Sequence, residues 1–160
     1  MVFRIWSHSY KEGDEMPNAQ RYHGMGQNGG NLSPSLFWED APDNTKSFVI
    51  TMYDPDASTG SGWWHWVVVN ISPNITHLVE GASSNKLLPE GAIEIRNDFG
   101  QKEYGGGAPP PGKPHCYIIT IHALNIARID VTPSSTPAFV GFNVHHHSLA
   151  SAQLICHLKG

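Results

Sequence analysis

The sequence has few of the features that mark several common protein classes. It contains two cysteines in 160 residues, Cys116 and Cys156, which is too few for a disulfide framework and favours a reduced pair. No segment approaches the run of roughly 18 apolar residues that a membrane span requires. Met1–Lys11 lacks the apolar core of a signal peptide, because Arg4 and Ser7 interrupt it. These absences predict a cytoplasmic protein without a membrane span.

Charge is also scarce. Charged residues make up 15% of the chain, the formal net charge is −4, and lysine and arginine form no cluster. A nucleic-acid-binding surface normally carries clustered basic charge, so neither DNA nor RNA is expected as a partner. Hydrophobic residues, at 39%, suffice for one core, and a single domain over residues 1–160 is expected. The 16 glycines and 12 prolines favour a mainly β fold with many loops over a helical bundle.

The strongest local pattern is a pair of apolar segments around a polar loop. Phe48–Tyr53 and Trp64–Ile71 are rich in β-branched and aromatic residues, which predicts two buried strands. The loop between them is rich in glycine and small hydroxyl residues and carries Asp54 and Asp56. Asp54 follows the first strand and His65 begins the second, so both are expected at one end of a sheet. Binding groups concentrate on loops that a rigid scaffold holds in this way.

Side-chain alternation predicts the direction of the residues that begin the second strand. Because successive strand residues face opposite sides, Trp63 and His65 are expected to point one way. Trp64 and Trp66 are then expected to point the other way, away from a site at the loop.

The remaining pattern predicts five more strands and one helix. The strands are expected at Val2–Ser7, Leu36–Trp38, Ala92–Arg96, His115–Leu124 and Leu149–Leu158. The helix is expected at Ser134–His147, with Ser135 or Thr136 as its cap, Pro137 in its first turn, and Phe139 and Phe142 on one face. Consecutive helical residues point about 100° apart, so His145–His147 cannot bind a single ion and are expected on an exposed or interface surface.

Two long irregular segments separate these elements. Tyr22–Ser35 is rich in glycine and asparagine and is interpreted as a long ordered surface loop, since it lacks the lysine and the following helix of a P-loop. Asn97–Lys113 contains Gly105–Gly107 and Pro109–Pro111. Glycines permit close backbone approach and prolines stiffen a loop, so this segment is predicted to form a shaped wall.

The strand after this wall begins with a second candidate binding pair. His115 and Tyr117 are two residues apart, so both side chains are expected on one face at the strand entrance. Such a pair beside a glycine- and proline-rich wall is compatible with a binding site and equally with two structural residues.

These residues together resemble a known family. Asp-Pro-Asp-Ala at 54–57, Trp-x-His-x-Val-Val-Val-Asn-Ile at 63–71 and Pro-Pro-x-Gly-x-x-His-x-Tyr at 109–117 resemble the phosphatidylethanolamine-binding proteins, in particular their bacterial Raf-kinase-inhibitor-like branch. The resemblance extends from about Gly13 to Leu158. It implies an antiparallel β-sandwich with few short helices and a small anion-binding pocket. The pocket residues that it implies are Asp54, Trp63, His65, Ala108, Pro109, His115 and Tyr117.

The resemblance also implies macromolecular partners. Family members are associated with regulation of protein kinases by direct contact, and bacterial members are expected to form homodimers. Tyr22, Met25 and His145–His147 are the candidate rim of a dimer interface in this chain. Departures from the family pattern are Ser58, where a proline is usual, and Trp64, Trp66 and Cys116, which are expected to face away from the pocket.

The chemistry of the implied pocket favours a small phosphorylated or other anionic ligand. The rings of His65 and His115 and the phenol of Tyr117 supply hydrogen-bond donors, together with backbone N–H groups of the wall. Asp54 is expected to accept the far N–H of a histidine and fix its tautomer. An unperturbed histidine titrates near ~6.5, so anion affinity is expected to fall as the pH rises through that value.

A hydrolase is the alternative interpretation of the same residues. Two histidines and an aspartate can hold a catalytic zinc ion, and Ser58 or Ser61 is a candidate nucleophile beside His65. The sequence has no His-x-x-x-His or Gly-x-Ser-x-Gly context for either mechanism. Non-enzymatic binding without a metal or cofactor is therefore the prediction.

Overall fold

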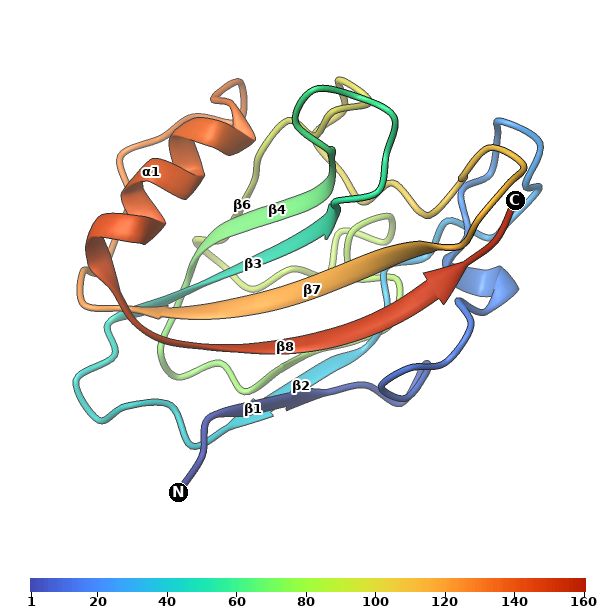
Figure 1. The fold of residues 1–160 in the computed structure, drawn as a ribbon. Coiled ribbons are helices and arrows are strands. Elements are labelled where there is room, and N and C mark those ends of the chain that lie inside the picture. Colours follow the sequence, from blue (N-terminus) through green and yellow to red (C-terminus); the bar gives the residue numbers. More distant parts are fainter.

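The computed structural model describes residues 1–160 and contains two antiparallel β-sheets (Figure 1). The five-stranded sheet has the order β6 (Ile93–Glu94), β4 (Trp63–Ile71), β3 (Ser47–Asp54), β7 (His115–Leu124) and β8 (Ser148–Leu158). The three-stranded sheet has the order β1 (Arg4–Trp6), β2 (Leu36–Glu39) and β5 (His77–Leu78). The helices are the 3₁₀ turn η1 (Asn18–Gln20) and α1 (Pro137–His147).

This architecture confirms the mainly β, antiparallel sandwich that the sequence predicts. The bounds of β7 agree at both ends, and β2, β3, β4 and β8 agree within one residue at each end. β1 and β6 are shorter than predicted, and β5 and η1 were not predicted. β5 has only two residues, which is too short for an alternating pattern to be recognised.

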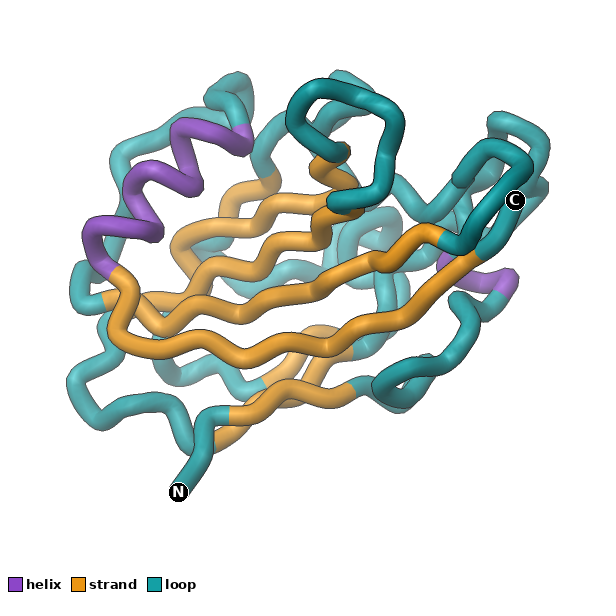
Figure 2. The backbone as a smooth tube through the Cα atoms, viewed as in Figure 1, coloured by secondary structure: helices purple, strands orange, loops and turns teal.

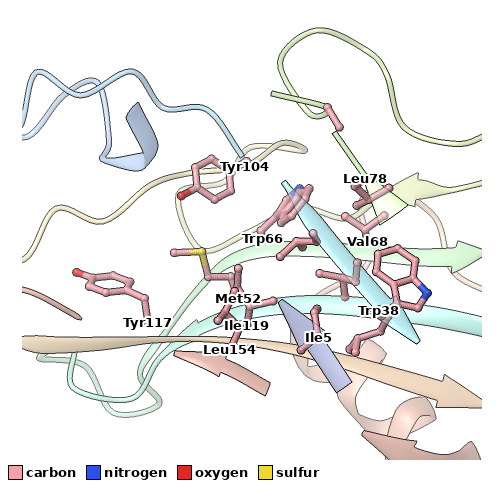
Figure 3. Packing of buried hydrophobic residues seen from close by; sticks show 14 of the residues in the cluster. Ile5, Trp38, Met52, Trp66, Val68, Leu78, Tyr104, Tyr117, Ile119 and Leu154 are labelled. Carbon is pink, nitrogen blue, oxygen red and sulfur yellow. The ribbon is translucent and has the colours of Figure 1, made fainter. Parts of the chain in front are cut away.

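The main core lies between the two sheets and contains 21 buried residues (Figure 3). Met52, Trp66 and Ile119 of the large sheet contribute to it from one side, and Ile5 and Trp38 of the small sheet from the other. The alternating patterns of β3, β7 and β8 explain this layer, because every second side chain faces inward.

The opposite face of the large sheet is covered over part of its length by α1 (Figure 1). Val140 and Val144 of the helix pack with Val49, Val67 and Val69 in a second cluster of eight buried residues. Neither α1, with 11 residues, nor η1 is long and apolar enough to cross a membrane.

The local predictions for α1 are confirmed in part. Thr136 is its N-cap, and its hydroxyl accepts a hydrogen bond from the backbone N–H of Phe139 at 3.1 Å. The helix begins at Pro137, later than predicted. Phe139 and Phe142 are 48% and 60% exposed, so α1 presents aromatic rings to solvent.

The predicted directions at the start of β4 are wrong for Trp66. Met52 pairs with Trp66 and Tyr53 pairs with Trp64, so His65 is an extra residue that has no partner on β3. Such a bulge breaks the alternation. His65 and Trp66 therefore both point toward the inner side, and only Trp64 points outward, against the ring of Tyr53 at 4.2 Å.

The loops gather at the end of the large sheet where the C-terminus lies (Figure 2). Gly106 is buried, and its N–H donates to the Asn31 side chain at 2.8 Å. A Cβ on Gly106 would collide with the carbonyl oxygen of Gln20 and the backbone of Arg21. The glycine-rich segment thus packs directly on the backbone that leads into the Tyr22–Ser35 loop, which confirms the predicted wall.

This packing predicts that Gly106→Ala lowers the free energy of unfolding by about 1–3 kcal/mol, the usual cost of overpacking. The matched control is Gly60→Ala, because a Cβ on Gly60 meets no atom within 4 Å. Urea denaturation of both variants measures the effect, and the control is expected within about 0.5 kcal/mol of the parent protein. Equal stability of the two variants would contradict the close approach of the two segments.

Candidate ligand-binding site

A cavity of about 190 Å³ lies where β3 ends and β4 and β7 begin. All seven residues that the resemblance implies line this cavity: Asp54, Trp63, His65, Ala108, Pro109, His115 and Tyr117. Trp64, Trp66 and Cys116 do not line it, as predicted. The bulge at His65 helps to assemble the site, because it turns this ring toward the ring of Tyr117.

Six further residues line the cavity and are not among those that the resemblance implies: Met25, Ala57, Ser58, Thr59, Phe99 and Pro110. Of these, only Ser58 was considered for the site, as a candidate nucleophile of the hydrolase alternative. Ala57–Thr59 belong to the same loop as Asp54. Met25 comes from the Tyr22–Ser35 loop and has a left-handed φ of 53°. Phe99 comes from the wall segment and stacks on Tyr22 at 4.4 Å. The glycine-rich loop is therefore a surface connection that also supplies part of the cavity mouth.

Asp54 and His115 form a buried pair on the cavity wall. Their side chains approach at 2.8 Å between Asp54 Oδ2 and His115 Nδ1, and the two residues are 3% and 5% exposed. The other carboxylate oxygen of Asp54 accepts the backbone N–H of Asp56 at 2.8 Å. Asp56 in turn accepts the backbone N–H of Cys116 at 2.8 Å. Asp54 thus binds a histidine as expected, and the loop after β3 is tied to β7.

His65 is held in one tautomer by a backbone carbonyl. Its Nδ1 lies 2.8 Å from the carbonyl oxygen of Gly105, and an N–H must donate there because a carbonyl only accepts. Burial lowers the pKa of His65, although the carbonyl of Gly105 and the carboxylate of Asp54 oppose this shift. His65 is therefore uncharged at neutral pH, and its pKa lies below the unperturbed value near ~6.5 on which the expected pH dependence rests.

The second nitrogen of each histidine is free. Nε2 of His65 and Nε2 of His115 have no hydrogen-bond partner in the chain, and neither atom is sealed from solvent. Both residues line the cavity, so these atoms are open to it.

Tyr117 supplies a neutral donor, whereas the N–H of Trp63 is buried. Burial, reinforced by the charge of Asp54, raises the pKa of Tyr117, so its phenol keeps its proton. The Tyr117 ring meets the His65 ring edge-on at 5.2 Å. Nε1 of Trp63 is buried without a hydrogen-bond partner, which ordinarily costs about 1–3 kcal/mol. Because this atom is sealed from solvent, the indole contributes its ring to the cavity wall and its N–H does not reach a ligand.

The hydrolase features do not assemble around these groups. Ser58 lines the cavity and Ser61 does not, and neither hydroxyl forms a hydrogen bond with a histidine. No group of three or more His, Cys, Asp or Glu side chains is close enough to hold a metal ion. The buried pair is therefore not hydrogen-bonded to either candidate serine and has no third metal-ligating side chain beside it.

Comparison with known proteins places the chain in a family. The family model described as "Phosphatidylethanolamine-binding protein" matches residues 6–159. UPF0098 protein YbhB of Escherichia coli K12 is 51% identical over 152 residues, which cover 94% of this chain and 96% of the relative. The crystal structure of E. coli YbcL is 42% identical and covers 100% of this chain and 99% of its own, with a TM-score of 0.97.

A more distant structure has the same architecture. CT736 of Chlamydia trachomatis, whose structure is titled a putative phosphatidylethanolamine-binding protein homolog, is 25% identical, with a TM-score of 0.80. It covers 99% of this chain and 98% of its own. With the two sheets, the cavity and these relatives in agreement, the chain belongs to the phosphatidylethanolamine-binding protein family.

Proposed function

We propose that this protein binds small phosphorylated or other anionic ligands in the cavity and leaves them chemically unchanged. The observation that carries the proposal is the pair of immobilised imidazoles. Each Nδ1 is bonded to the protein, and each Nε2 is open to the same cavity. The family description and the phospholipid in its name support a ligand of this chemistry.

The cavity offers donors for the oxygens of an anion. The phenol of Tyr117 is a donor at neutral pH, and His115 adds a second donor when it is protonated. Several oxygens of one phosphate or carboxylate can accept such bonds at once, and these bonds strengthen where water is excluded.

Apolar groups surround these donors. The apolar residues that line the cavity include Met25, Trp63, Phe99 and the Pro109–Pro110 segment. These side chains offer no hydrogen bonds to the polar part of a ligand, which is therefore expected to contact the donors. Concave sites with mostly apolar walls and a few convergent polar groups are the usual form of small-molecule sites. A ligand with a compact anionic head and a short apolar or zwitterionic tail fits this arrangement.

Removal of one imidazole tests the site. His115→Ala is expected to weaken binding of phosphate and phosphorylethanolamine at least tenfold, because a hydrogen bond to a charged group is worth roughly 1.5–3 kcal/mol. The matched control is His77→Ala, since His77 is exposed in β5 on the other sheet and is expected to leave affinity unchanged. Isothermal titration calorimetry measures both variants against the parent protein.

The same samples separate binding from turnover. Equal affinity of the parent protein and His115→Ala would remove the site assignment. Phosphatase or esterase activity that disappears in His115→Ala would replace the binding proposal with the hydrolase.

Larger partners belong to this proposal as well. The resemblance supports a protein kinase as a partner by direct contact and a homodimer, and the sequence composition supports a cytoplasmic location. The predicted dimer rim divides into two places: Met25 lies at the cavity mouth near His115, and His147 lies beside the far end of β7. Ten strand residues separate these ends, roughly 30 Å, so a compact interface uses one place. The exposed rings of Phe139 and Phe142 beside His146 favour the outer face of α1.

Light scattering tests this interface. At neutral pH and tens of micromolar protein, we expect twice the 17.6 kDa mass of one chain. A two-fold interface presents each residue twice, so Phe142→Ser is expected to yield monomers. Acid is expected to weaken association, because histidines that line such an interface would carry like charges in both copies. Phe37→Ser on the small sheet is the control. A monomer mass for the parent protein would reject the homodimer.

A further inference from the structure

The cavity lacks the basic residues that phosphate sites usually contain. None of its thirteen lining residues is lysine or arginine. Its titratable lining groups are Asp54, His65, His115 and Tyr117. Two of these, His65 and Tyr117, are neutral at neutral pH for the reasons given above. The charge of the cavity is therefore set by Asp54 and His115.

That pair never contributes a net positive charge. With His115 protonated, it is an ion pair of zero net charge, and with His115 neutral, it carries the single negative charge of Asp54. The charged groups that act on the cavity from neighbouring loops are also carboxylates. Asp56 acts on Tyr117 from the loop after β3, and Asp98 acts on His65 from the wall segment. Cys156, behind Tyr117 on β8, is uncharged because burial raises its pKa to about 12.

The hydrogen-bond pattern adds a second constraint. Neutral His65 carries its proton on Nδ1, where it donates to Gly105, so its open Nε2 is a bare acceptor. An acceptor facing a ligand requires a donor on that ligand. Fully deprotonated phosphate oxygens only accept hydrogen bonds, and they would face both this lone pair and the Asp54 carboxylate.

We propose that the cavity selects the singly charged, hydrogen-bearing form of a phosphomonoester and discriminates against the doubly charged form. This inference rests on the proposed anion binding and specifies its charge state. The P–O–H group of the ligand donates to Nε2 of His65. Another ligand oxygen accepts from the phenol of Tyr117. A single negative charge on the ligand is compatible with a cavity of zero or negative net charge only because the phenol dipole of Tyr117 faces it. A second negative charge has no cation to neutralise it.

The protonation state of the ligand then sets the pH dependence of binding. A phosphomonoester loses its second proton with a pKa of about 6. Above that value the singly charged fraction falls about tenfold for each pH unit, and affinity calculated on total ligand falls with it. A phosphodiester remains singly charged throughout but has no P–O–H, so its binding is expected to be weaker and nearly independent of pH.

The experiment uses methyl phosphate and dimethyl phosphate with the full-length chain between pH about 5.5 and 8. Calorimetry is expected to show the steep loss of affinity for methyl phosphate above pH about 6 and a flat profile for dimethyl phosphate. Phosphorus NMR gives a direct reading, because the shift of a phosphomonoester depends on its protonation. Methyl phosphate bound at pH about 7.5 is expected to show the shift of the singly charged form.

A charge added at the rim supplies the matched variants. Ser58 is exposed and lines the cavity, so Ser58→Lys places an ammonium beside the ligand without disturbing the core. This variant is expected to bind doubly charged methyl phosphate and to have a shallower pH profile. Ser58→Gln, of similar length and no charge, is expected to keep the parent profile.

Three outcomes overturn the inference. The first is an affinity for methyl phosphate that stays constant up to pH about 8, and the second is a phosphorus chemical shift of bound methyl phosphate that matches the doubly charged form. The third is an equal loss of affinity for methyl phosphate and dimethyl phosphate with rising pH, which would mean that a group of the protein titrates and not the ligand. Absence of binding by either ligand at pH about 5.5 would instead reject the anion-binding function itself.

Discussion

The hydrogen bond between Asp54 and His115 is the constraint on which the site depends. It joins the last residue of β3 to the first residue of β7, two strands that pair along seven registered positions. Because the pair is almost fully buried, loss of either partner would leave an unpaired polar group, which costs more than the bond contributes. The second oxygen of Asp54 and the bond from Cys116 to Asp56 extend the same link along the loop. The wall of the cavity is thereby set by the geometry of the sheet.

Burial determines which chemistry these residues can perform. The same low-dielectric surroundings that strengthen the Asp54–His115 bond keep His65 uncharged and Tyr117 protonated. A charged imidazole at His65 would attract any small anion into the cavity, with little selectivity among anions. With a neutral one, the cavity presents a defined order of donors and acceptors, and recognition depends on the hydrogens of the ligand as well as its charge.

Strand β7 could be predicted from the sequence because its signal is local, whereas the full set of seven cavity residues came from the family resemblance. Alternation places His115 and Tyr117 together, and motif spacing brings Asp54 and His65 to the same sheet end. The direction of Trp66 could not be predicted, because the bulge at His65 arises from pairing with β3 and not from β4 itself. Met25 and Phe99 reach the cavity through packing of two irregular loops, which no period in the sequence encodes. Whether the seven residues bind a ligand remains a prediction.

An anion site without lysine or arginine has a physical rationale in a cavity this small. A buried ammonium or guanidinium must be desolvated and paired in the empty protein, and the nearest carboxylate, Asp54, already binds His115. Neutral donors such as the phenol of Tyr117 avoid that penalty. Such dipoles are fixed before the ligand arrives and lose little freedom when it binds. The cost of this arrangement is weak attraction for a second negative charge, so neutral donors couple affinity to the protonation state of the ligand.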